Sequence, residues 1–203
     1  MNSGHPSPAE IGNRRSGFSL MELMIVLGLL VAVAAIATPT LLSEMRNNRV
    51  YDAGETVREV LAESRRLAID SGIDYQFRYE PNGQHFIVVP TEIEPKDSNS
   101  LIGEQSTSTY VRLTGDLGSG FRIRAMDDTQ DTAERLGPEW FGNVQDGALL
   151  AQKSWSTARL FRFDGTSDDF KFRVTDDAER TVEISVRGLT GAVRLSQVYQ
   201  GSL

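Results

Sequence analysis

The sequence predicts an α+β fold in which one long N-terminal helix, a membrane stem and then an amphipathic half, packs on an antiparallel β-sheet head. Three observations carry this prediction. Residues 23–43 contain no charged side chain, and residues 47–69 repeat small and apolar side chains at helical spacing. After Gly72, seven segments have the pattern of β-strands.

Composition excludes several functional classes. The 203 residues carry a net charge of −7, which argues against a broad nucleic-acid-binding surface because such a surface needs clustered Lys and Arg. There is no cysteine, so neither a disulfide framework nor a thiolate zinc site can form. The two histidines are His5 and His85, and a Ser-His-Asp triad would have to use His85, which no nucleophile-elbow motif accompanies. We predict no enzymatic activity, no catalytic residue and no cofactor.

Acidic turns are the remaining candidates for a metal site. Calcium prefers oxygen ligands, and three Asp pairs could supply them, but none has EF-hand spacing. We predict no metal site and leave open whether one of these turns binds calcium. The pairs are Asp127-Asp128, Asp168-Asp169 and Asp176-Asp177.

The first residues divide into a polar leader and an apolar span. Residues 1–17 are rich in Ser, Gly, Pro and Asn and contain the pair Arg14-Arg15. Residues 18–43 include a charge-free run of ~30 Å as a helix, enough to cross the core of a bilayer. The Arg pair before this span orients the leader toward the cytoplasm and the rest of the chain outward.

Two interpretations of this N-terminal region compete. It could be a secretory signal cut after Ala35-Ile36-Ala37, which would release a secreted binding module. Against this stands Glu22 at the start of the apolar run, because a carboxylate in a membrane segment is costly and is by default a functional residue with a partner. If the chain is cut after Gly17 instead, the new amino group of Phe18 lies at i, i+4 from Glu22 and can pair with it.

The segment Gly17-Phe18-Ser19-Leu20-Met21-Glu22, followed by the apolar run, resembles the processing site of type IV prepilins and type II secretion pseudopilins. The resemblance implies cleavage after Gly17 by a prepilin peptidase, N-methylation of Phe18 and a role for Glu22 in filament assembly. Members of this family also commonly carry a proline at the distance of Pro39, where a helix-interior proline bends the helix.

The helix is predicted to continue through residues 44–71 as an amphipathic segment that enters the head. Its small and apolar positions form one stripe with a period near 3.6, and charged residues cover the opposite face. Ser71-Gly72 supplies a C-terminal stop. The stripe consists of Val50, Ala53, Gly54, Val57, Val60, Leu61, Ser64, Leu67 and Ala68.

Residues 72–203 are predicted to form the β-rich head. Residues 91–119 and 126–158 are expected to be long loops whose role the sequence does not define, with Trp140 and Trp155 as anchors against the core. Because apolar and polar residues alternate in the C-terminal strands, we expect them to be half-buried, with Phe161 and Phe163 on one face. The predicted strands cover residues 73–79, 85–89, 121–125, 159–163, 170–174, 181–186 and 192–195.

Two further features, the end of the helix and the pattern of the C-terminal strands, narrow the resemblance to a subfamily. Residues 61–69 at the end of the helix, together with Phe161 to Gly165 and Thr190 to Val193, are similar to H-type minor pseudopilins and related minor pilins. This implies a structural subunit of a type II secretion pseudopilus, held in the inner membrane with its N-terminus cytoplasmic and its head periplasmic, and partnered by other pseudopilins. The alternative is a minor pilin of a type IV pilus or DNA-uptake apparatus. Residues 188–203 contain only Arg194 as a cation, which disfavours contact with nucleic acid.

Overall fold

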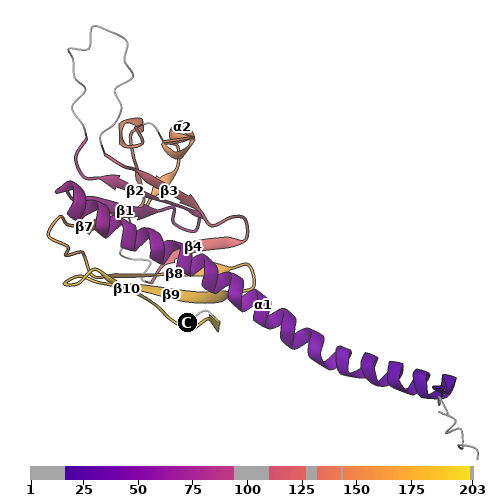
Figure 1. Ribbon diagram of the computed structural model, residues 1–203. Helices are drawn as coiled ribbons and strands as arrows, with labels where there is room; N and C mark the ends of the chain where they lie inside the picture. The colour runs from indigo at the N-terminus through magenta and orange to yellow at the C-terminus, as the bar shows by residue number, and fades with distance from the viewer. Residues whose placement is uncertain (1–16, 94–109, 127–131, 143, 202–203) are drawn as a thin grey trace, which may run out of the picture. The chain divides into compact units, whose positions relative to one another are not determined.

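The computed structural model describes residues 17–93, 110–126, 132–142 and 144–201, apart from the side chains at positions 39 and 40. It has the predicted α+β fold, with one long helix and antiparallel sheets (Figure 1). The chain divides into two units, residues 1–44 and residues 45–203, and each is described by itself below.

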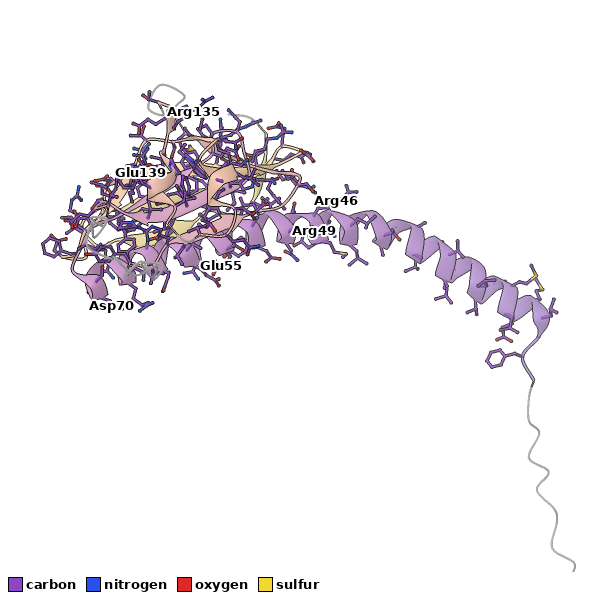
Figure 2. All side chains as sticks on the ribbon, turned by 90° about the horizontal axis from the view of Figure 1, so that it is seen from above. Arg46, Arg49, Glu55, Asp70, Arg135 and Glu139 are labelled. Carbon is purple, nitrogen blue, oxygen red and sulfur yellow. The ribbon has the colours of Figure 1, made fainter. Side chains whose placement is uncertain are left out.

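Helix α1 spans Leu20–Ser71, as the sequence predicts. Within residues 45–203 the predicted stripe faces the core, with Val50, Val57 and Leu61 fully buried. The outer face carries ion pairs of Arg58 with Glu55 and of Arg66 with Glu63 and Asp70. Glu55 and Asp70 mark this outer face in Figure 2.

The helix ends where a glycine permits it. Gly72 has φ of 72°, in the left-handed region that favours glycine, and its N–H donates to the carbonyl of Ala68 at 3.0 Å. The Ser71-Gly72 stop predicted from the sequence is confirmed.

The first sheet has strand order β3-β2-β1-β7 and is antiparallel throughout. Its strands are β1 Tyr75–Tyr79, β2 His85–Pro90, β3 Leu113–Asp116 and β7 Arg159–Phe161. The expectation that residues 91–119 form only a loop is wrong for β3, which pairs with β2. Gly115 of β3 lies beneath the ring of Phe86, where a Cβ would be 2.0 Å from Cζ. Residues 94–109 of that predicted loop lie outside the described residues.

The second sheet has strand order β10-β9-β8-β4, with β11 also pairing with β9. Figure 1 shows both sheets beside the C-terminal half of α1. Four strands of the second sheet fall where the alternation of apolar and polar residues predicts them, whereas the sequence did not predict β11. The strands are β4 Phe121–Ala125, β8 Phe170–Asp176, β9 Arg180–Arg187, β10 Ala192–Leu195 and β11 Tyr199–Gln200.

The main core lies between α1 and the two sheets. Aromatic rings from both sheets meet there: the centroid of Phe172 lies 5.7 Å from that of Phe77 and 5.4 Å from that of Tyr79. The helix comes close to the second sheet at Gly54, where a Cβ would lie 2.7 Å from a methyl carbon of Val182. Such an approach requires a residue without a side chain.

A second, smaller core covers the other face of the first sheet. Residues 126–158 were expected to be loop, but residues 132–158, as far as the structure describes them, contain short elements that pack Phe141, Leu150 and Trp155 onto Ile87 and Val89. These elements are β5 Glu134–Arg135, a 3₁₀-helix at Pro138–Trp140, α2 Gly147–Leu150 and β6 Ser154–Trp155. We call this covering segment the outer layer. The predicted anchoring role of Trp140 and Trp155 is confirmed, although they anchor this second core and not the main one.

The outer layer buries β1 on both faces. Tyr75, Phe77 and Tyr79 point into the main core, while Gln76 and Arg78 lie under the outer layer, and all five are buried. Arg78 donates to Gln76 Oε1 and Glu134 Oε2, each at 2.8 Å, and to the Ser156 carbonyl at 3.0 Å. A buried arginine therefore joins the outer layer to the sheet.

The expectation that Phe163 shares a buried face with Phe161 is wrong. Strand β7 ends at Phe161, which is fully buried, and the chain then turns through Gly165 with φ of 84°. Phe163 lies in that turn and its side chain is 58% exposed.

Candidate functional site

The predicted cleavage bond lies just before a helix. Gly17, Phe18 and Ser19 are non-helical, and α1 begins at Leu20. The first backbone hydrogen bond of the helix runs from the Leu23 N–H to the Ser19 carbonyl, at 3.1 Å. Phe18 is 76% exposed. Exposed, non-helical chain is where proteases cut most readily, so the Gly17–Phe18 bond is placed where a peptidase could act without unwinding the helix.

Glu22 lies in the first turn of α1 with its side chain exposed. Among the described residues it makes no ion pair or side-chain hydrogen bond. A carboxylate in the first helical turn interacts favourably with the helix dipole, whereas a positive terminus there is opposed by it. A carboxylate at this position could therefore offset the charge of an amino group generated at Phe18.

The helix surface that follows is apolar on all sides. Within residues 18–38 every side chain is exposed, and the helix is long and apolar enough to span a membrane. A helix that is hydrophobic all round needs an apolar environment, so this segment is a candidate membrane anchor. Its large exposed residues are Leu20, Met21, Leu23, Met24, Ile25, Val26, Leu27, Leu29, Leu30, Val31, Val33 and Ile36.

Position 39 lies inside α1, which is helical from Leu20 to Ser71. The side chain of Pro39 lies outside the described residues, and the kink proposed there stays a prediction. The leader, residues 1–16, also lies outside them.

His85 belongs to an ion cluster at the β1–β2 turn. Its Nδ1 lies 2.7 Å from Glu80 Oε2 and its Nε2 lies 3.7 Å from Asp116 Oδ2, so both ring nitrogens face carboxylates. Lys153 of the outer layer donates to Glu80 Oε1 at 3.0 Å. Burial raises the pKa of Glu80, but the hydrogen bonds from Lys153 and His85 together outweigh it and hold that pKa below its usual value. The cluster fastens the outer layer to the hairpin.

The acidic turns use their carboxylates to hold the backbone. Asp168 accepts from the Leu160 N–H at 3.0 Å and from Arg162 at 2.7 Å. Asp176 accepts from the N–H groups of Ala178 and Arg180, each at 2.9 Å. In the described part of the chain, no three His, Asp or Glu side chains are grouped so that they could hold a metal ion. Asp127 and Asp128 lie outside the described residues.

Sequence reasoning missed a group of cations on the second sheet. Lys171, Arg173, Arg187 and Arg194 come from β8, β9 and β10 and lie on the face of the sheet that points away from the main core; we call this surface the basic face. The signal was present in the alternation of Phe170-Lys171-Phe172-Arg173, whose apolar members are buried.

Comparisons with known proteins bear on the N-terminal segment. Residues 12–38 match the model of the prokaryotic N-terminal methylation motif. The chain carries this motif. The matched segment includes Gly17, Phe18 and Glu22, the residues on which the resemblance to prepilins rests. The specific roles of these three residues stay predictions.

A comparison with curated proteins finds no match. Among solved structures, the chain is similar to the minor pseudopilin EpsH from the Type 2 Secretion System of Vibrio cholerae. The identity is 12% and the TM-score 0.43, with 73% of this chain and 97% of that chain covered. A likeness of this degree carries no argument about function.

Proposed function

We propose that the protein is a non-enzymatic minor pseudopilin, a structural subunit of the pseudopilus of a type II secretion system. The observation that carries the proposal is the methylation motif at residues 12–38, continued by an apolar helix with one carboxylate in its first turn. A prepilin peptidase cuts after Gly17 and the new terminus at Phe18 is methylated. The helix anchors the subunit in the inner membrane, with the head in the periplasm.

Electrostatics supports the role of Glu22 in assembly. After cleavage, the amino group of Phe18 is a positive charge at the N-terminal end of a helix, where the dipole opposes it. Glu22 follows four residues later and can neutralise it, either in the same subunit or in a neighbour. In an apolar filament core or bilayer, an unpaired carboxylate costs several kcal/mol, so packing that brings both charges together is favoured.

The apolar surface of α1 supports assembly through the helix. Its side chains between Leu20 and Ile36 are exposed in the single chain. Lipid covers them before assembly, and the helices of other pseudopilins cover them in the filament. Partner choice can then depend on the head, which has its own core and its own surface.

The test compares Glu22→Ala with Glu44→Ala, since these two carboxylates flank the charge-free run and both are exposed. Full-length protein is extracted from membranes, and its intact mass and N-terminal sequence are determined. We expect methylated Phe18 as the terminus in the wild type and both variants. Incorporation of the Glu22→Ala variant into filaments should fall by roughly tenfold or more, because a charge pair in a low-dielectric core is lost, while the Glu44→Ala variant should assemble normally.

A terminus at Thr38 in a soluble product would refute the whole proposal and leave a secreted module. Loss of surface pili or DNA uptake in a deletion strain, with secretion intact, would replace the pseudopilin assignment with that of a minor pilin.

A further inference from the structure

We propose that the basic face binds an acidic, partly apolar segment of another protein. This surface belongs to the head, so its binding does not depend on which assembly the N-terminal helix serves.

Strand register places the cations on one surface. Lys171 lies opposite Ser185 on β9, and Ser185 lies opposite Arg194 on β10. Residues directly opposite each other share a face, as do residues two apart on one strand, so Arg173 and Arg187 lie on this surface too. The neighbouring positions Phe170, Phe172, Val174, Val182, Ile184 and Val186 point into the main core. The cations therefore face away from it.

Three of these cations are not paired with a carboxylate in the described part of the head. Among the residues that the structure describes, Arg173, Arg187 and Arg194 make no side-chain hydrogen bond or ion pair. Arg173 also lies directly opposite Arg124 of β4, and the Nε atoms of both are buried without a partner. Like charges opposite each other destabilise a sheet, and within the described residues only Arg124 of the two has an ionic partner, Glu179 at 3.6 Å. A carboxylate bound at this surface would reduce the repulsion between the two guanidinium groups.

The surface has a groove that could hold a peptide segment. It measures about 540 Å³ and its lining includes Ala125, Met126, Lys171, Arg187 and Arg194. Arg159 lies at the same groove, with its guanidinium carbon 5.9 Å from the ring centroid of Phe170. The lining thus combines cations with apolar carbon, which suits a segment that carries both carboxylates and apolar side chains.

Acidic groups within the basic face favour a protein partner over nucleic acid. Glu183 lies opposite Arg173 and pairs with Lys171 at 3.1 Å, and Asp169 lines the groove. A continuous phosphate backbone would meet these carboxylates at close spacing, whereas a peptide can place single carboxylates against single guanidinium groups. Sequence composition agrees, since a net charge of −7 makes non-specific attraction to nucleic acid weak.

The experiment measures binding to defined probes by fluorescence anisotropy, with the full chain in neutral detergent. The probes are a labelled peptide of alternating glutamate and leucine, a lysine–leucine peptide of equal length and a labelled oligothymidylate. The test variant is Arg187→Glu/Arg194→Glu. The matched control is Arg49→Glu/Arg135→Glu, which changes net charge equally at two exposed cations on α1 and β5, both labelled in Figure 2.

We expect saturable binding of the glutamate–leucine peptide alone. Because each exposed charge pair is modest in energy, reversing two of them should weaken binding by about tenfold, against about twofold or less for the control. Added salt should weaken it further. If charge reversal disturbs folding, as judged by circular dichroism, Arg187→Ala/Arg194→Ala should still weaken binding severalfold.

Three results would overturn the proposal. Equal losses in the test and control variants would mean that only net charge matters. Tighter binding of oligothymidylate with the same variant dependence would make the basic face a nucleic-acid surface. Self-association that the test variant abolishes would make the occupant a second copy of this chain.

Discussion

Replacing Arg78 with methionine tests whether the outer layer is held to the sheet by one buried cation. The Arg78 side chain is 10% exposed, whereas its ionic partner Glu134 is 49% exposed. Removing the guanidinium leaves Gln76 Oε1 and the Ser156 carbonyl without their donors, in a region where both residues are buried. Removing the carboxylate leaves those two bonds intact.

Burial sets the size of the two effects. An unsatisfied buried polar group costs about 1–3 kcal/mol, and methionine recovers only the packing of the aliphatic part of arginine. We therefore expect Arg78→Met to lower the free energy of unfolding by about 3 kcal/mol. The Glu134→Gln variant keeps a hydrogen-bond acceptor, and water can take the place of the lost carboxylate at this half-exposed position. We therefore expect Glu134→Gln to lower the free energy of unfolding by only about 0.5–1 kcal/mol. For a head of this size these values correspond to falls in Tm of about 6–12 °C for Arg78→Met and about 1–4 °C for Glu134→Gln.

The measurement is thermal unfolding of the full chain in neutral detergent, followed by two probes. Both tryptophans of the chain, Trp140 and Trp155, belong to the outer layer, so their fluorescence reports this segment. Far-ultraviolet circular dichroism reports the sheets. The fluorescence transition of Arg78→Met should move more than the dichroism transition. If the two variants lose equal stability, the exposed ion pair and not the buried hydrogen bonds holds the outer layer, and the reasoning fails.

Two further predictions concern packing and charge in the head. Gly54→Val should lower the free energy of unfolding by about 2 kcal/mol, because its Cβ would lie 2.7 Å from Val182 and overpack the core. The cost of overpacking exceeds the small stabilisation from the higher helix propensity of valine. An unchanged midpoint of chemical denaturation would refute this prediction. Glu80→Gln should cost about 1–2 kcal/mol at pH 7, because it weakens the bonds from Lys153. The folded-state pKa of Glu80 is lowered, so this stabilisation is present above the unfolded value of about 4.3 and is lost as pH falls below it. Unfolding at several pH values checks this, with the exposed Glu139→Gln as a control that should show no such trend.

Local sequence defines the helix and most strands because their patterns are periodic. The stripe from Val50 to Ala68 repeats at 3.6 residues, and a helix with that stripe has only one face to bury. Alternation in β8 and β9 determines the buried face in the same way. The candidate processing site is also local, since Gly17, Phe18 and Glu22 lie within six consecutive residues of the sequence.

Elements that depend on distant partners could not be predicted in this way. Strand β3, Leu-Thr-Gly-Asp, has no strand pattern of its own and exists because it pairs with β2 and leaves room for the ring of Phe86. In the outer layer, Leu136, Phe141, Leu150 and Trp155 follow neither helical nor strand spacing. They become a core only because Ile87 and Val89 offer an apolar surface on the far side of β2.

The grouping of charges on the surface of the head also depends on distant partners and could not be predicted from local sequence. Counting cations along residues 188–203 finds only Arg194 and suggests that the tail region lacks a basic surface. The sheet instead places Arg194 on the same face as Lys171 and Arg187, which are 23 and 7 positions away in the sequence. A net negative charge and a concentrated basic face are compatible, because solvent screens charges beyond about 10 Å and a partner segment responds mainly to the groups within that distance. The alternation of apolar and cationic residues on neighbouring strands, and not net charge, is therefore the sequence signal to examine when a β-rich head is searched for a binding surface.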